Sequence, residues 1–183
     1  MFKESRISCE RPIYEILLIL KVSNTVKSDI HFFKYLVLSS FMFKPNTTVA
    51  CVVVCQNKFL LVEETEDNKQ VFNQPAGHLE KNESLLEAAK RELYEETGLT
   101  LEPQYLSGIY QNEVPEKNVQ YLRFCYVIEL EGEPPATSPK DSDITAAHWF
   151  SYQEIYTKEN EMRSKMVKVC IDDYLSGQKL PLS

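Results

Sequence analysis

The stretch GHLEKNESLLEAAKRELYEETGL, residues 77–99, carries most of the information about this chain. It places Glu92, Glu95 and Glu96 at positions i, i+3 and i+4. Because an α-helix turns about 100° per residue, these three side chains share an arc of roughly 100° on one face of a helix. The spacing therefore predicts a helix over residues 83–97 that presents a cluster of carboxylates.

Neighbouring residues favour the same helix. Asn82 is of a type that caps helix N-termini, and Gly98 suits the C′ position that ends a helix. Glu87 and Arg91 stand four residues apart with the acid first, which is the favourable order for an ion pair. An adjacent arc carries apolar side chains that we expect to face a core: Leu86, Ala89 and Leu93.

The carboxylate cluster has two interpretations. A run of charges is usually a solvated face without further function. However, like charges one helical turn apart repel each other, and a cation placed among them removes the repulsion. Mg²⁺ prefers oxygen ligands from carboxylates, water and substrate phosphates. The second interpretation is therefore a Mg²⁺ site, with Mn²⁺ as a substitute, that holds a polyphosphate.

The glycines and the arginine of this stretch favour the second interpretation, because together with the glutamates they resemble the signature of the Nudix hydrolase superfamily. The matching positions, with no departure, are Gly77, Glu83, Arg91-Glu92-Leu93, Glu95-Glu96 and Gly98-Leu99. Other segments are similar to one branch of small bacterial phosphatases: 73–80, 122–124, 141–144 and 176–178. The resemblance covers residues 42–183 and implies an α/β (α+β) fold, an α/β/α sandwich with a mixed β-sheet and a loop-helix-loop catalytic motif.

The resemblance also implies a set of metal ligands: the backbone carbonyl of Gly77 and the side chains of Glu92, Glu95 and Glu96. The same glutamates and Arg91 form the implied catalytic group, in which Glu92 is a further ligand or the base. Arg91 pairs with Glu83 or with a catalytic glutamate and fixes its rotamer; the alternative is an ordinary surface ion pair. Glu83 and Gly98 are implied to shape the motif.

Four residues outside this cluster are predicted to contact the substrate: Phe72, Gln74, His78 and Arg123. A lone histidine is more often structural, and a structural role is the alternative for His78. Phe72 has core packing as its alternative, as do other aromatic residues that can stack on a planar ring: Tyr110, Tyr121 and Trp149. Arg123 lies in an apolar strand, where an unpaired charge is costly, so we expect it to pair with an acid or to reach the phosphates.

A phosphoanhydride is the bond that such a site would hydrolyse. The resemblance implies a nucleoside tri- and diphosphatase that releases orthophosphate and also acts on thiamine pyrophosphate and hydroxymethylpyrimidine pyrophosphate. The implied partner is thus a small phosphorylated metabolite. Two alternatives stay open at this point. One is a Nudix pyrophosphohydrolase that cleaves a nucleoside-diphosphate sugar or a capped RNA end, and the other is a ligand-sensing module without catalysis.

Composition narrows the choice of partner. The chain has 183 residues, a formal net charge of −7 and 43% hydrophobic residues, which suits an ordered domain. It shows no basic stripe, so we expect no nucleic-acid partner and no binding to anionic membranes. We also expect a monomer. The five cysteines follow no metal or disulfide spacing, which favours free thiols in a reducing cytoplasm. Cys51 and Cys55 are expected in the core.

The first 41 residues differ from the remainder, because they hold patchy apolar runs without clean periodicity. We expect residues 1–41 to be an N-terminal extension, or the product of a start codon assigned too early, and residues 42–183 to form the Nudix domain. In that domain, apolar runs predict strands at 47–55, 58–64, 71–73, 101–111, 119–130 and 146–150. The C-terminal region predicts helices at 152–156 and 162–175.

Overall fold

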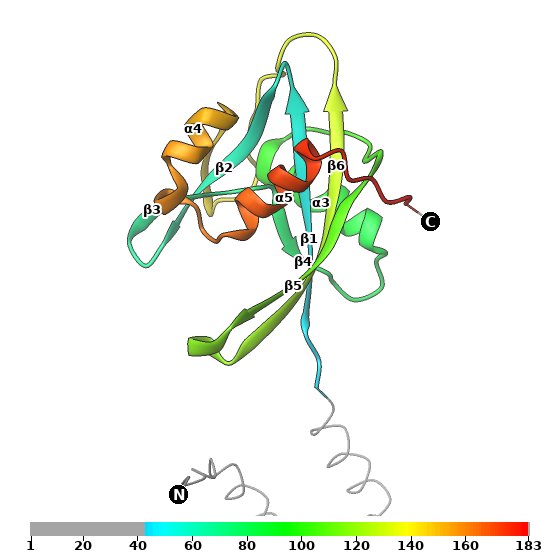
Figure 1. The fold of residues 1–183 in the computed structure, drawn as a ribbon, viewed down its shortest axis with the longest axis vertical. Coiled ribbons are helices and arrows are strands. Elements are labelled where there is room, and N and C mark those ends of the chain that lie inside the picture. Colours follow the sequence, from blue (N-terminus) through cyan, green and yellow to red (C-terminus); the bar gives the residue numbers. More distant parts are fainter. Residues whose placement is uncertain (1–42, 183) are drawn as a thin grey trace, which may run out of the picture. The chain divides into compact units, whose positions relative to one another are not determined.

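Seven strands form one mixed sheet in residues 43–182, the part of the chain that the computed structural model describes (Figure 1). The strands are β1 (Asn46–Cys55), β2 (Lys58–Glu66), β3 (Lys69–Asn73), β4 (Ala76–His78), β5 (Tyr105–Val114), β6 (Val119–Leu130) and β7 (Ile144–Ser151). The helices are α3 (Leu85–Thr97), α4 (Tyr152–Thr157) and α5 (Met166–Leu175), with the short 3-10 turns η1 (Pro115–Lys117) and η2 (Glu159–Glu161). The predicted extension over residues 1–41 lies outside the described residues.

One edge of β1 pairs with two different strands. The first half of β1 pairs antiparallel with β4, where Val49 is opposite Gly77, whereas only its end pairs with β2. β3 pairs with β2, so the chain crosses from β2 to β1 between β3 and β4. On its other side, β1 runs parallel to β6 from Asn46 to Cys55. The start of the Nudix signature is thereby built into the sheet next to β1.

The two faces of the sheet carry separate hydrophobic cores, because successive side chains of a strand point to opposite faces. One core packs under α3 and includes Val49, Cys51, Val53, Leu60, Ala88, Ala89 and Leu93. The other packs under α5 and includes Ala50, Val52, Val54, Phe59, Leu61, Val167, Cys170 and Ile171. In Figure 1, α5 crosses the near face of the sheet. The predicted α/β/α sandwich with a mixed sheet is confirmed.

The signature helix is confirmed, but it begins later than predicted. Its N-cap is Ser84, whose side chain accepts the N–H of Glu87 while the Glu87 carboxylate accepts the N–H of Ser84. Asn82 was the predicted cap and lies before the helix in a left-handed conformation with φ of 70°. Asn82 and Ser84 are both of a type that caps helices. Only Ser84 has a glutamate three residues later, so only Ser84 can form the reciprocal pair with Glu87. Gly98 ends the helix with φ of 75°, as predicted.

The largest of the other differences from the predicted bounds are at the starts of β5 and α5, and both have local causes. β5 starts at Tyr105 rather than at residue 101, since Pro103 has no N–H to contribute to a strand. α5 starts at Met166 rather than at residue 162. Met162 instead bridges Phe72, and the N–H of Arg163 donates to the Phe72 carbonyl at 2.9 Å. The chain therefore follows β3 before it turns into the helix.

The cysteines within residues 43–182 are free and buried: Cys51, Cys55, Cys125 and Cys170. Burial raises the pKa of Cys51 well above its ordinary value, so its thiol stays protonated. The core positions expected for Cys51 and Cys55 are confirmed. Among the described helices, none combines the length and apolar character that crossing a bilayer requires.

Candidate active site

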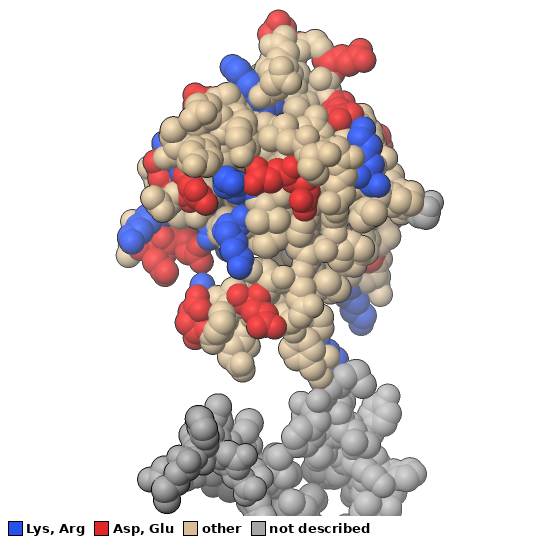
Figure 2. Space-filling model, in the orientation of Figure 1, with Lys and Arg blue, Asp and Glu red and all other residues tan. Residues whose placement is uncertain are grey.

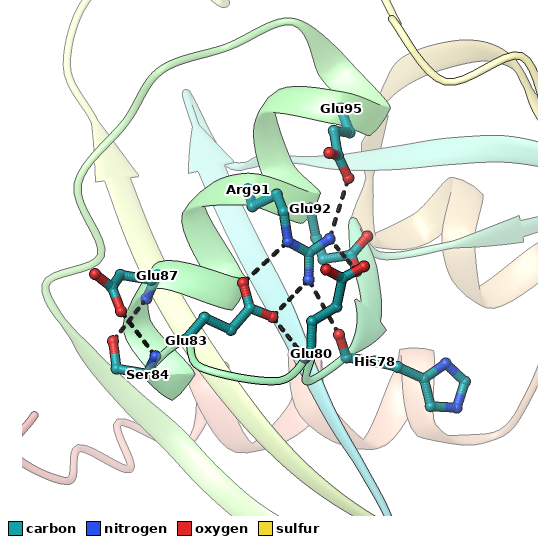
Figure 3. Close-up of polar contacts among 8 residues, drawn as sticks. All are labelled: His78, Glu80, Glu83, Ser84, Glu87, Arg91, Glu92 and Glu95. Carbon is teal, nitrogen blue, oxygen red and sulfur yellow. Dashed lines mark hydrogen bonds and ion pairs between the residues drawn. The ribbon is translucent and has the colours of Figure 1, made fainter.

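Arg91 lies at the centre of a carboxylate network on α3 (Figure 3). Its Nε and Nη2 atoms bind the two oxygens of Glu83 at 3.0 and 2.8 Å, which is a bidentate pair. Nη1 binds Glu92 at 2.8 Å and Glu95 at 3.1 Å. The His78 carbonyl accepts a further bond from Nη2 at 3.1 Å. The predicted pairing of Arg91 with Glu83 is confirmed, and Arg91 binds two predicted catalytic glutamates as well.

These contacts shift the pKa values of both Arg91 and Glu83. The hydrogen bond from Arg91 lowers the pKa of Glu83, with help from the N–H of Glu80. In return, the bond to Glu83 raises the pKa of Arg91, which stays charged. The predicted ion pair between Glu87 and Arg91 was wrong. The Glu87 carboxylate is used in the helix cap, whereas Arg91 turns toward the loop before the helix.

Gly77 lets the Glu92 carboxylate lie directly against β4. A Cβ atom at position 77 would overlap the Glu92 carboxylate, so no larger residue fits without moving it. The register directs the Gly77 carbonyl toward Val49, because hydrogen-bonded pairs alternate in an antiparallel ladder. Pairs of this kind flank it, since Cys51 N–H donates to Pro75 and Leu79 N–H donates to Thr47.

Ala76, one residue earlier, has its backbone polar groups on the side away from β1. Its N–H donates to Oε2 of Glu96 at 2.8 Å. Glu96 is 8% exposed. Its pKa is raised to about 8, chiefly by burial and also by the nearby charges of Glu92, Glu64 and Asp141, against the opposing effect of the hydrogen bond from Ala76. Glu96 is therefore a buried carboxylate that forms no ion pair with a basic side chain of residues 43–182.

Glu64 and Asp141 belong to this site, although the sequence did not single them out as functional. Glu64 lies on β2, and its Oε2 accepts a bond from Arg163 at 2.6 Å. Its Oε1 is buried without a hydrogen-bond partner among the described residues. Asp141 forms a turn, because its side chain accepts the N–H of Asp143 at 2.9 Å. The prediction did not place either residue near α3.

The loop that contains Asp141 also closes the C-terminal end of α3. The N–H groups of Lys140 and Asp141 donate to the Glu95 carbonyl at 2.7 and 2.9 Å, and that of Ser138 donates to the Thr97 carbonyl at 2.8 Å. The last carbonyls of a helix have no partner within it. This loop supplies those partners and so holds Glu95 and Glu96 in place.

The donor set fits a hard divalent cation. Carboxylate oxygens of Glu92 and Glu96 converge on β4, and the unpartnered Oε1 of Glu64 is a buried acceptor near them. In the described residues, however, no three His, Cys, Asp or Glu side chains gather as a ready metal cluster. Arg91 explains this, since its guanidinium draws Glu92 and Glu95 toward itself.

The raised pKa of Glu96 predicts a pH effect on stability. Between pH 4.5 and about 8, the folded state holds a proton on Glu96 that the unfolded state has released. We therefore expect the thermal midpoint, measured in a chelating buffer, to fall as pH rises through that window and to level off above it. Glu96→Gln removes the titrating group and should flatten the curve. Parallel curves for the two proteins would contradict the assignment.

The side chains of the predicted substrate residues lie on the α5 side of the sheet, apart from the Arg91 network. Phe72 packs in the core against Phe150, with ring centroids 5.1 Å apart, so its alternative role is confirmed. Gln74 is fully buried and donates from Nε2 to the Val167 carbonyl at 2.9 Å. His78 is exposed, and Figure 3 shows its imidazole pointing away from Arg91. Arg123 makes no ion pair with any described residue.

Comparison with known proteins assigns the chain to a family. Residues 44–170 match the NUDIX domain family, and the chain belongs to it. Phosphatase NudJ of Escherichia coli (strain K12) is 51% identical over 141 residues, which cover 77% of this chain and 90% of that protein. NudJ of Shigella boydii serotype 4 (strain Sb227) matches to the same extent. The predicted superfamily and branch are both confirmed.

Solved structures support the same assignment. A NUDIX hydrolase from Nitrosomonas europaea is 41% identical with a TM-score of 0.70, covering 76% of this chain and 94% of that one. The NUDIX domain of Shewanella oneidensis NrtR, solved with ADP ribose, has a TM-score of 0.63 at 16% identity, which shows the fold alone. The protein is thus a Nudix hydrolase that acts on phosphorus-containing acid anhydrides.

Proposed function

We propose that the protein is a Mg²⁺-dependent, NudJ-like phosphatase that releases orthophosphate from nucleoside tri- and diphosphates. We extend the proposal to thiamine pyrophosphate and hydroxymethylpyrimidine pyrophosphate. The main support is the intact carboxylate network around Arg91, combined with 51% identity to Phosphatase NudJ over most of the chain. An acidic protein with a net charge of −7 needs cations to hold such substrates. On the face that Figure 2 shows, acidic and basic side chains are interspersed.

The metal would be held by Glu92, Glu95 and Glu96, with Mn²⁺ able to replace Mg²⁺. The resemblance assigns a backbone carbonyl of Gly77 to the same site. Since the register turns that carbonyl toward Val49, we propose the Ala76 carbonyl as the backbone ligand. Gly77 then serves as the position whose missing side chain admits Glu92. When bound, Mg²⁺ supplies charge neutralisation on phosphate oxygens and acidifies a water molecule.

The side chains of this chain perform the positioning. Arg91 holds Glu92 and Glu95 and is itself held by Glu83, so the carboxylates keep their orientation. Glu92 acts as a further ligand or as the base that takes a proton from the attacking water. Its pKa is raised, chiefly by burial, which strengthens it as a proton acceptor. Hydrolysis of a phosphoanhydride depends mainly on such positioning and electrostatic stabilisation.

A phosphate-release screen tests the proposal. We expect the purified protein, with Mg²⁺, to release orthophosphate from nucleoside tri- and diphosphates and from the two thiamine-related pyrophosphates. Nucleoside-diphosphate sugars and capped RNA should release none directly, because their phosphates are esterified at both ends. Nucleoside monophosphate as the product of the sugar compounds would favour a different Nudix pyrophosphohydrolase. Binding of these compounds without turnover would favour a ligand-sensing module.

We also propose that the enzyme works in the cytoplasm as a monomer. The support for the compartment is that the four described cysteines are buried as free thiols. The proposed partner is a small phosphorylated metabolite, without nucleic acid or membrane, since a net charge of −7 disfavours both polyanions.

A further inference from the structure

Two neighbouring polar side chains on the α5 side of the sheet have unused hydrogen-bonding atoms. Thr48 is 5% exposed, and its Oγ1 has no hydrogen-bond partner among the described residues. The Nη1 atom of Arg123 is also buried and without a partner there. Thr48 and Arg123 are directly paired in the register of β1 and β6. Buried polar groups nearly always have a hydrogen-bond partner in folded proteins, so these two neighbouring atoms are available to bind a ligand.

This pair lies on the opposite face from the catalytic glutamates. Side chains alternate along β1, and Ala50 and Val52 pack in the core under α5, so Thr48 shares their face. By the same rule Arg123 shares the face of Cys125, which also belongs to that core. The glutamates of α3 belong to the other face. Arg123 is therefore placed to contact the organic part of a substrate rather than the phosphates next to the metal.

Two aromatic rings, those of His78 and Tyr121, lie beside Thr48 and Arg123 on the same face of the sheet. His78 is opposite Thr48 in the register of β1 and β4. The rings of His78 and Tyr121 have centroids 6.2 Å apart and are inclined by 49°. His78 is exposed and Tyr121 is partly buried, whereas Thr48 between the strands is buried. These four residues thus combine buried polar atoms with neighbouring aromatic surfaces, an arrangement that suits a flat ring.

We propose that Thr48 and Arg123 recognise a planar nitrogen heterocycle, such as a nucleobase or a substituted pyrimidine, through its ring nitrogen or carbonyl acceptors. This inference rests on the proposed function and adds Thr48 to it as a specificity-determining residue. Arg123 supplies a charged donor, and Thr48 supplies a hydroxyl that donates or accepts. The His78 and Tyr121 rings border the heterocycle. β4 then separates ring recognition on one face from phosphate chemistry on the other.

The test compares a nucleoside triphosphate with inorganic tripolyphosphate, which has the same anhydride bonds but no ring. Thr48→Val keeps the shape of the side chain and removes the hydroxyl. We expect kcat/KM to fall about 10-fold or more for the nucleotide and to stay unchanged for tripolyphosphate, because a lost hydrogen bond to substrate has that scale. Arg123→Met should show the same selectivity. Thr47→Val is the matched control, since Thr47 points to the other face.

The experiment distinguishes failure of the subsite from failure of the proposed function. Equal losses on both substrates, or no loss on the nucleotide, would overturn the inference while leaving the proposed function intact. If the wild type hydrolyses neither compound, the proposed function fails. In that case calorimetry with the nucleoside triphosphate decides the inference alone: weaker binding by Thr48→Val than by Thr47→Val supports the subsite, and equal binding refutes it.

Discussion

Glu95→Gln is expected to lower turnover by at least ~10²-fold, the scale of one lost acid–base or electrostatic element. The side chain of Glu95 is 44% exposed, and Arg91 is its one ion-pair partner among the described residues. It is thus the most accessible of the three clustered carboxylates. Glutamine keeps the shape and the hydrogen bond from Arg91 but removes the charge that holds a cation. The measurement is steady-state phosphate release, with circular dichroism to show that the fold is unchanged.

A matched control distinguishes this effect from a general loss of surface charge. Glu102→Gln makes the same chemical change at a carboxylate that is 76% exposed and pairs with Lys90 on α3 at 2.6 Å. Surface ion pairs contribute little to stability, so this variant should keep normal turnover. Near-normal turnover of Glu95→Gln, or an equal loss in both variants, would remove Glu95 from the catalytic group.

Removal of divalent ions should have the largest effect of all. In excess EDTA we expect turnover to fall by ~10³-fold or more, because several kcal/mol of charge stabilisation on the phosphate oxygens is lost. Addition of Mg²⁺ beyond the chelator should restore it, and Mn²⁺ should restore part of it. The physical reason is the burial of Glu96, which is 8% exposed and binds the Ala76 N–H but no basic side chain in the described part of the chain.

The same titration contains its own control. Arg91 neutralises part of the carboxylate charge and holds the loop before α3, so the fold should persist in EDTA. Circular dichroism in EDTA should therefore match that in Mg²⁺. Full activity in EDTA would contradict the proposed metal site, whereas loss of activity together with loss of structure would show that the ion acts on folding instead.

Features that depend on interactions between residues close in sequence could be predicted, whereas features that depend on distant residues could not. The signature helix, its Gly98 terminus and most strands could be predicted because hydrophobic periodicity and turn residues act within a few positions. The turn at Gln56 and Asn57 is one example, with both residues at positive φ as a tight hairpin needs. β4 was missed because a strand of three residues has no periodicity to detect.

The residues of the candidate site also fall into predictable and unpredictable groups. The glutamates and Arg91 lie on one helix, so their spacing in sequence already determines their spacing in the structure. Glu64 and Asp141 reach the site from β2 and from a distant loop. No local pattern links them to α3, and only the folded chain brings their charges close to Glu96. Thr48 was missed for the same reason, since an ordinary threonine in a strand has no local signature.

The sequence by itself therefore determined the helix and its carboxylate face, since both depend on contacts within about four residues along the chain. It also determined the family, because the signature lies within one continuous stretch, residues 77–99. The tertiary structure alone decided that Arg91 binds Glu83 rather than Glu87, and that burial raises the pKa of Glu96 to about 8. It also decided that Arg123 and the glutamates lie on opposite faces of the sheet. These features depend on burial and strand register, which arise only when distant segments pack together.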